Sequence, residues 1–203
     1  MTRIVLASTS HARRLLLTNA GVAFESIAAP VDERALETPL IAAGASPSDI
    51  ALALAEAKAH AVLVLHPDAL VIGGDQVLDL DGERLVKPGN RSGAAAQIAC
   101  LAGRTHVLRT AVAIAQRGEI VWRHVESATL TMRPLTARAI ERYLDDAGDG
   151  IFGSVGAYHL EERGIRLFSA IEGDYFSILG LPLLPLLEAL RDAGAIDGDE
   201  APA

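Results

Sequence analysis

The chain has 203 residues, of which 18 are Lys or Arg and 26 are Asp or Glu, so its formal net charge is −8. This acidic balance argues against a nucleic-acid polymer or an anionic membrane surface as the main partner, because both attract basic faces. The length corresponds to one domain, and a hydrophobic fraction of 50% excludes disorder for most of the chain. A single cysteine, Cys100, excludes a disulfide framework and suits the reducing cytoplasm, where we expect this protein to reside.

The first third of the chain alternates predicted strands and helices. A short buried strand is predicted over Ile4–Ala7, a second strand over 24–28, and an apolar strand over 69–72 that ends at Gly73-Gly74-Asp75. Helices are predicted over 13–20 and from Ser46 to about Leu65, where a serine cap, a proline and an aspartate open the helix. The stretch 30–45, which contains Asp32 and Glu33, is predicted to be an irregular loop. No apolar stretch is long enough to span a bilayer.

The remainder of the chain predicts antiparallel strands and further helices. Two hairpins are expected, one turning at Asp81-Gly82 and one joining strands 105–116 and 119–133 at Arg117-Gly118. Helices are predicted over 92–101, 136–146 and 183–193, and a strand over 165–170. The fold class is therefore α/β, with a mixed, twisted β-sheet flanked by helices and bent into two lobes with a cleft. We expect a single domain over 1–191 and a disordered acidic tail over 192–203.

A first candidate anion site follows the first predicted strand. Three hydroxyl residues, Ser8, Thr9 and Ser10, precede a helix that begins with Arg13 and Arg14. Basic residues at a helix amino terminus oppose the macrodipole, and a bound anion would compensate for that cost. A solvated, slightly unfavourable helix start explains the same residues, and physics alone leaves both interpretations open.

A second candidate site surrounds Asp75. A carboxylate at the end of a buried apolar strand lies where α/β proteins place ligands, and the two preceding glycines allow a ligand to approach the backbone. An aspartate in a strand-terminating turn is the alternative. Lys87 follows through the predicted hairpin, whereas Lys58, in an alanine-rich helix, would by itself be interpreted as a surface residue.

Together these segments resemble the Maf family of nucleoside triphosphate pyrophosphatases, also called septum-formation inhibitor-like proteins. The resemblance extends from Ile4 to Leu190 and includes seven ordered motifs. They are Leu6-Ala-Ser-Thr-Ser10 with Arg13, Val31-Asp32-Glu33, Leu54-Ala-Glu-Ala-Lys58-Ala, Gly74-Asp75-Gln76-Val77, Lys87-Pro88, Leu101-Ala-Gly-Arg-Thr-His106, and Glu172-Gly-Asp-Tyr175 through Gly180-Leu-Pro182.

The resemblance implies a fold like that of Maf and inosine triphosphate pyrophosphatases, and a homodimer. It implies hydrolysis of a nucleoside triphosphate between the α- and β-phosphates, with Asp75 as the proton acceptor. A divalent cation, Mg²⁺ or Mn²⁺, would be held by Glu33 and Asp75. Phosphate would be bound by hydroxyl and basic groups, namely Ser8, Ser10, Arg13, Lys58 and Lys87. The charges of this set nearly balance a triphosphate only when the divalent cation is included.

Three positions bear on the choice of nucleotide within the family. The branch acting on dTTP and UTP has an arginine, a threonine and a glutamine where this chain has Ala12, Gln76 and Glu161. Gln76 and Glu161 instead resemble the branch acting on N7-methyl-GTP, which often has an aromatic residue at the position of Ala12. A carboxylate can accept from the N1–H and N2–H of guanine, and Glu162 is an alternative base reader. Other hypotheses are a nucleotide-binding regulator of cell division with little catalysis and a metal-dependent phosphatase.

Overall fold

The computed structural model describes residues 2–197 and divides them between two compact units. The first unit contains the chain up to Gln76, Thr110–Glu126 and the chain from Gly180, and the second contains Val77–Arg109 and Ser127–Leu179. One seven-stranded mixed sheet has the order β2-β1-β3-β5-β6-β7, with β4 paired to β3. The predicted mixed α/β fold is thereby confirmed, and the cleft between two lobes stays a prediction.

Parallel strands organise the first unit. Strand β1 (Ile4–Ala7) pairs in parallel with β2 (Glu25–Ser26) on one side and with β3 (Leu70–Leu80) on the other. The register places Ala7 opposite Gly73, so the carboxyl end of β1 lies beside the glycine pair of β3. The strand predicted over 24–28 is confirmed only for its two central residues.

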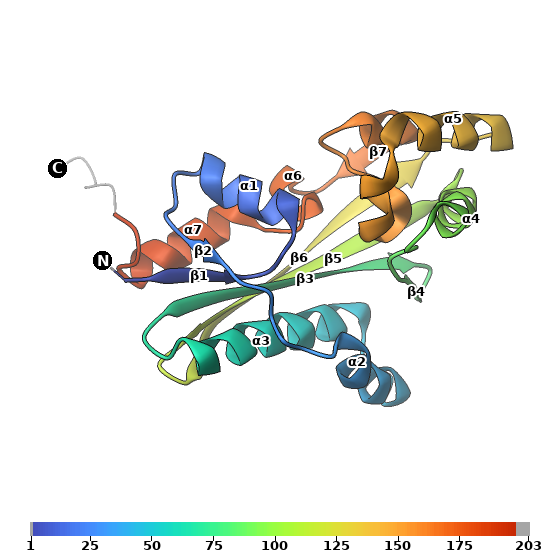
Figure 1. The fold of residues 1–203 in the computed structure, drawn as a ribbon. Coiled ribbons are helices and arrows are strands. Elements are labelled where there is room, and N and C mark those ends of the chain that lie inside the picture. The colour runs from blue at the N-terminus through green and yellow to red at the C-terminus, as the bar shows by residue number, and fades with distance from the viewer. Residues whose placement is uncertain (1, 198–203) are drawn as a thin grey trace. The chain divides into compact units, whose positions relative to one another are not determined.

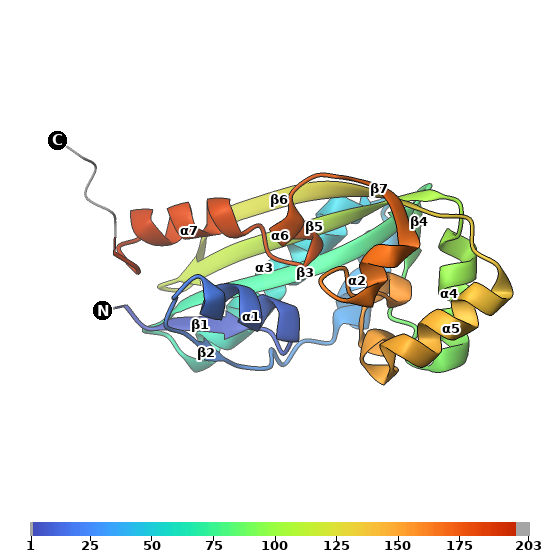
Figure 2. The ribbon, with the colours of Figure 1, turned by 90° about the horizontal axis from the view of Figure 1, so that it is seen from above.

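Helices cover both faces of these strands. Helices α1 (His11–Asn19) and α7 (Leu183–Asp192) lie on one face, and α2 (Glu33–Ala42) and α3 (Pro47–Leu65) lie on the other (Figures 1 and 2). The core on the α3 side is built mostly from alanine and valine residues. Its buried members are Val5, Ala7, Ala59, Val62, Leu63, Ala69, Val71 and Ala115. Helix α3 begins with the predicted serine cap, which forms a complete capping box between Ser46 and Asp49.

The irregular loop predicted over 30–45 is wrong, because most of it forms α2. The Asp32 carboxylate accepts a hydrogen bond of 3.0 Å from the Ala35 N–H and caps the helix, so the residue predicted in a loop is an N-cap. Pro39 lies inside the helix and removes one backbone donor. The packing of α2 against α3 compensates for this loss. Glu33 is therefore the first residue of a helix.

The strand end predicted at Gly73-Gly74-Asp75 is also wrong, because β3 continues through both glycines to Leu80. Strand β3 is hydrogen-bonded to β1 and to β5, and this tertiary pairing overrides the weak strand propensity of glycine. The hairpin after β3 is confirmed, since Asp81 and Gly82 have φ angles of 55° and 88° and lead into β4 (Glu83–Leu85). Asp75 thus lies within a strand, not in a turn.

A glycine allows β3 to approach α3 closely. A Cβ atom on Gly73 would overlap the carbonyl oxygen of Ala55 and would lie 2.8 Å from the Cβ of Ala59. The neighbouring Gly74 is less crowded, since a Cβ there would lie 3.5 Å from the Nε of Arg13. The absence of a side chain at Gly73 therefore sets the distance between α3 and β3.

The second unit combines antiparallel strands with short helices. It contains β4 and β7 (Phe168–Glu172), together with parts of β3, β5 (Thr105–Gln116) and β6 (Glu119–Met132). Helices α4 (Arg91–Leu101) and α5 (Ala137–Ala147) pack on each other, as Figure 2 shows. Three 3₁₀-helices, η1 (Asp149–Gly153), η2 (Val155–Ala157) and η3 (Arg163–Leu167), precede β7, and a short α6 (Tyr175–Ile178) follows it. The strand predicted over 165–170 therefore begins three residues too early, because η3 occupies its start.

The carboxyl-terminal segment is described up to Asp197. Helix α7 includes Asp192, and the Ala195 N–H donates to the carbonyl oxygen of Leu190 at 2.9 Å. Residues 198–203 of the predicted tail lie outside the described residues, and disorder over 192–203 stays a prediction. Within residues 2–197, no helix is both long and apolar enough to cross a membrane.

A histidine is buried in the core of the second unit. His106 is 1% exposed, and its Nε2 lies 2.8 Å from the hydroxyl oxygen of Tyr158. Its Nδ1 has no hydrogen-bond partner among the described residues. Burial lowers the pKa of His106 from 6.5 to about 4, because the apolar surroundings disfavour the imidazolium.

The pKa shift of His106 predicts a loss of stability in mild acid. Below pH 6.5 the unfolded chain binds a proton that the folded protein refuses until about pH 4, so the free energy of unfolding falls as the pH falls through this window. The loss between pH 7.5 and pH 5 should be roughly 2 kcal/mol. Urea unfolding of the parent protein and of His106→Gln, which has no such titration, measures the difference. Equal pH dependence of the two proteins would contradict the prediction.

The packing of Gly73 against α3 predicts a large effect of a single methyl group. Gly73→Ala forces β3 and α3 apart and should lower the free energy of unfolding by about 3 kcal/mol or more. Gly74→Ala is the matched control and should cost about 1 kcal/mol or less, since its added Cβ makes only ordinary contacts. Denaturant unfolding compares the two variants, and similar losses for both would show that the α3–β3 distance does not depend on Gly73.

Candidate functional site

The candidate site lies at the carboxyl end of the parallel strands. Because β1 has a parallel neighbour on each side, the connections from these strands diverge to opposite faces of the sheet, as Figure 1 shows for α1 and α3. In α/β proteins such a point is where ligands bind, outside the carboxyl ends of the strands. Ser8 is the first residue after β1 and is buried.

The serines after β1 hold the start of α1. Ser10 caps the helix by accepting a hydrogen bond of 3.4 Å from the Arg13 N–H. The Ser8 hydroxyl oxygen accepts from the Ser10 N–H at 3.2 Å and from Arg13 Nη1 at 3.4 Å. The Ser8 carbonyl oxygen in turn accepts from the Ser26 hydroxyl at 2.6 Å. Both predicted serines therefore lie in one hydrogen-bonded turn, and their hydroxyl protons are the groups that could donate to an anion.

Arg13 joins three segments that are distant in the sequence. Its Nε donates to the carbonyl oxygen of Gly180 at 2.7 Å, and its Nη1 donates to that of Gly74 at 2.8 Å. Gly180 has a φ of 98°, and a Cβ there would lie 3.2 Å from Arg13 Nε, so the close approach suits glycine. The guanidinium thus ties these segments together through Nε and Nη1, and Nη2 takes no part in these bonds.

A buried ammonium group connects two carboxylates. Lys58 Nζ lies 2.6 Å from Asp75 Oδ1 and 2.6 Å from Glu33 Oε1. Lys58 and Asp75 are 9% and 8% exposed, whereas the Glu33 side chain is 43% exposed. The interpretation of Lys58 as a surface residue is therefore wrong. Its α3 neighbours at helical spacing, Leu54 and Val62, are buried, so this lysine interrupts an apolar stripe, which is the sequence signal that marks it.

The four charged groups act on one another. Burial lowers the pKa of the Arg13 guanidinium, and the negative charges of Asp75 and Glu33 oppose that shift. Arg13 and Lys58 carry two positive charges, and Glu33 and Asp75 can carry two negative ones, so this set is neutral when all four are ionised. Buried charges are tolerated when they are paired in this way.

The metal predicted at Glu33 and Asp75 can be tested for fit against these residues. No group of three or more His, Cys, Asp or Glu side chains among residues 2–197 could hold a metal ion. Mg²⁺, however, is commonly bound by one or two carboxylates, with substrate phosphates and waters as the other ligands. Two carboxylate oxygens that share one ammonium, as those of Glu33 and Asp75 do, also lie within reach of a single cation. The residues therefore fit a magnesium site that the substrate completes.

The predicted specificity residues fall in both units. In the first unit, Ala12 is half-buried on α1, and Gln76 Nε2 donates to the Thr110 hydroxyl at 2.8 Å. In the second unit, Lys87 and Glu161 are exposed, and Glu162 lies 3.5 Å from His159 Nδ1. The structure brings together six of the predicted residues, all in the first unit: Ser8, Ser10, Arg13, Glu33, Lys58 and Asp75. The roles of Lys87 and Glu161 stay predictions.

Sequence reasoning missed two groups that support this site. The Gly180 carbonyl oxygen anchors Arg13, and the buried Thr110 orients Gln76. Gly180 belongs to one of the seven family motifs, which indicates that its position matters but not that it contacts Arg13. Thr110 occupies a strand without any motif, and nothing in the sequence distinguishes it from the β-branched residues around it.

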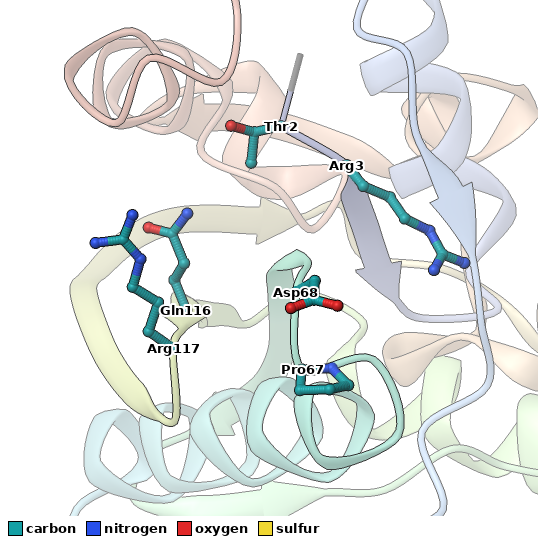
Figure 3. Close-up of a pocket in the computed structure, with 6 residues that line it drawn as sticks. All are labelled: Thr2, Arg3, Pro67, Asp68, Gln116 and Arg117. Carbon is teal, nitrogen blue, oxygen red and sulfur yellow. The ribbon is translucent and has the colours of Figure 1, made fainter.

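A pocket of about 430 Å³ lies elsewhere in the first unit. Its lining comes from the residues that precede β1 and β3 and from the end of β5, so it is at the opposite end of these strands from Asp75. Figure 3 shows the lining residues Thr2, Arg3, Pro67, Asp68, Gln116 and Arg117. Arg3 is held by Glu25 through two hydrogen bonds of 2.7 and 2.9 Å. None of the residues predicted for nucleotide chemistry lines this pocket.

Comparison with known proteins identifies the family. Residues 3–193 match the family described as Maf-like protein. A 7-methyl-GTP pyrophosphatase of Rhizobium meliloti is 55% identical over 96% of this chain and 98% of its own length. One of Brucella abortus is 50% identical over 97% and 98% of the two chains, and a nucleoside triphosphate pyrophosphatase of Caulobacter vibrioides is 48% identical over the same shares. The family that the seven motifs predicted is therefore confirmed, and the chain belongs to the Maf family.

Proposed function

We propose that this protein hydrolyses a nucleoside triphosphate between the α- and β-phosphates, releasing a nucleoside monophosphate and pyrophosphate, and that 7-methyl-GTP is its preferred substrate. The observation that carries the proposal is the ion cluster of Lys58, Asp75 and Glu33 at the carboxyl ends of parallel strands, in a chain whose close relatives bear these activities as names. The protein is thus an enzyme of the nucleoside triphosphate pyrophosphatase class.

Asp75 is the group that acts on the water. As a carboxylate held in one orientation by Lys58, it accepts a hydrogen bond from a water and directs its attack at the α-phosphorus. Arg13 Nη2 and the Lys58 ammonium stabilise negative charge on the phosphate oxygens, and the Ser8 and Ser10 hydroxyls donate to them. Most of the rate comes from this positioning and charge, since phosphoryl transfer demands little covalent chemistry from the protein.

Glu33 and Asp75 are the residues that would hold a divalent cation, Mg²⁺ or Mn²⁺. When bound there, the cation supplies positive charge against the phosphates. Glu33 in α2 and Asp75 in β3 would supply its carboxylate ligands, and substrate and water would supply the others. The exposure of the Glu33 side chain leaves its carboxylate accessible from solvent.

The choice of 7-methyl-GTP rests on the relatives and on two side chains. Relatives at 49–55% identity over nearly the whole chain carry that name. Gln76, adjacent to Asp75 in β3, has an amide held by Thr110 and can pair with a base edge. The exposed carboxylate of Glu161 favours the positive charge of a methylated guanine. The homodimer, the cytoplasmic location and the lack of a nucleic-acid partner remain predictions.

Replacing Asp75 tests its role. Asp75→Asn removes the carboxylate charge while keeping its size, and we expect pyrophosphate release to fall by about 10²–10⁴-fold, the range for loss of a general base. Asp79→Asn is the matched control, because Asp79 is a buried aspartate of the same strand that pairs with Arg109 instead. It should keep the rate within about threefold of the parent. A parental rate in Asp75→Asn would show that Asp75 is not the base.

The substrate is tested by comparing four nucleotides. Initial rates with Mg²⁺ should give a kcat/KM for 7-methyl-GTP at least about tenfold above those for UTP and dTTP, because one pair of base contacts discriminates by about 1–3 kcal/mol. GTP, which lacks the methyl group and its charge, should lie between them. Separate assays for pyrophosphate and orthophosphate distinguish a pyrophosphatase from a phosphatase. A preference for UTP or dTTP would exclude guanine selection, and release of orthophosphate alone would exclude the proposed reaction.

A further inference from the structure

We propose that Lys58 fills the cation position between Glu33 and Asp75 in the nucleotide-free protein, so that a divalent cation binds only together with the nucleotide. This inference rests on the proposed function and concerns the order in which the site is filled. In the absence of nucleotide, the lysine ammonium acts as an internal counter-ion. When phosphates arrive, Lys58 releases the carboxylates and turns to the phosphates.

The geometry allows one cation between the carboxylates. Lys58 Nζ is 2.6 Å from an oxygen of each, so it lies at the point that a bridging cation would need. Mg²⁺ binds oxygen at about 2.0–2.1 Å, slightly closer than an ammonium does, and the two cations cannot share this position. Binding of the metal to both Glu33 and Asp75 therefore requires Lys58 to move.

Charge decides when that exchange is favourable. Without nucleotide, the positive charges of Arg13 and Lys58 balance the negative charges of Glu33 and Asp75. A divalent cation added to this neutral set would leave an excess of two positive charges beside Lys58 and Asp75, which are buried. A triphosphate brings about four negative charges at neutral pH, so in its presence the same set requires more positive charge.

The side chain of Lys58 is suited to such a movement. Its ammonium is carried on a flexible four-carbon stem, and its charge can be transferred from carboxylate to phosphate oxygens without leaving the site. Arg13 is different, because its Nε and Nη1 are fixed to the backbone carbonyl oxygens of Gly180 and Gly74. Of the two basic groups in this cluster, Lys58 is thus the one that can exchange partners.

The small number of metal ligands supplied by the protein agrees with binding of the metal together with the nucleotide. Residues 2–197 contain no cluster of three or more acidic, histidine or cysteine side chains suited to a metal. Two carboxylates whose charges are already balanced by Lys58 and Arg13 attract a divalent cation weakly. Phosphate oxygens supply both the missing ligands and an alternative partner for Lys58.

Metal binding without nucleotide provides the first test. The affinity for Mn²⁺ is measured by electron paramagnetic resonance on the parent protein, on Lys58→Gln and on Arg14→Gln, an exposed residue of α1 that loses the same charge. Removing the competing ammonium should tighten Mn²⁺ binding at least about tenfold in Lys58→Gln, whereas Arg14→Gln should stay within about threefold of the parent. Equal or weaker binding by Lys58→Gln would overturn the proposal.

A second test needs no change at Lys58 and therefore applies even if Lys58→Gln fails to fold. The chain has only two lysines, Lys58 and Lys87, so a nitrogen-correlated NMR spectrum of the side-chain ammonium groups contains at most two signals. Lys87→Gln identifies the Lys58 signal. Millimolar Mg²⁺ alone should leave that signal in place, and Mg²⁺ with a non-hydrolysable 7-methyl-GTP analogue should shift it. A shift with Mg²⁺ alone, or no shift with both ligands, would overturn the proposal.

The two proposals fail separately. The Mn²⁺ measurements contain no nucleotide, so they report on Lys58 whether or not the protein hydrolyses one. A parent protein that releases no pyrophosphate from any nucleotide would contradict the proposed function while leaving the Mn²⁺ comparison valid. Active parent enzyme combined with unchanged Mn²⁺ affinity in Lys58→Gln would contradict only the exchange of cations.

Discussion

The ion pairs of Lys58 are the interaction on which the candidate site depends. A lysine, an aspartate and a nearby arginine are all withdrawn from water in the first unit, and each would be costly there alone. Lys58 on α3 meets Asp75 on β3 where the two elements pack closely, and this close packing leaves no room for a side chain at Gly73. The ion pair of Asp75 is thus linked to the close packing of the α3 and β3 backbones.

Arg13 imposes a second constraint on the same region. By donating to the carbonyl oxygens of Gly74 in β3 and of Gly180 before α7, it fixes the turn at Ser8 relative to both segments. Arginine is suited to this task because its planar group donates in several fixed directions at once, which lysine cannot do. In the proposed function, a phosphate bound by the remaining nitrogen of this fixed guanidinium would be held in a defined position, at the cost of freedom to adapt.

Much of the fold could be predicted from local signals in the sequence. The capping box at Ser46 and the turn dipeptides Asp81-Gly82 and Arg117-Gly118 act within a few residues, and the elements they bound are those predicted. Helix α2 contains a proline, and its packing on α3 is not visible in the local sequence, so a loop was predicted there instead. The continuation of β3 through two glycines was missed because pairing with neighbouring strands is invisible in a local pattern.

In the candidate site, too, some features follow from local sequence and others depend on tertiary packing. The types of residue that carry its chemistry could be predicted from motifs, and the carboxylate–lysine–carboxylate arrangement could not, because Glu33, Lys58 and Asp75 meet only through the packing of α2, α3 and β3. The lysine's position in an apolar helical stripe was the one local sign of its burial. Periodicity identifies which side chains are buried, but it does not identify the charge that each one meets.

The acidity of the whole chain adds a final consequence for the proposed reaction. A net charge of −8 repels a free triphosphate of about four negative charges at long range, and the neutral cluster around Asp75 does little to attract it. A triphosphate already complexed with a divalent cation carries about half that charge, so it approaches with less repulsion. In the exchange that we propose, such a complex also brings the cation that replaces the Lys58 ammonium between Glu33 and Asp75. The overall charge and the local ion pairs therefore favour the same partner, a nucleotide that arrives with its metal.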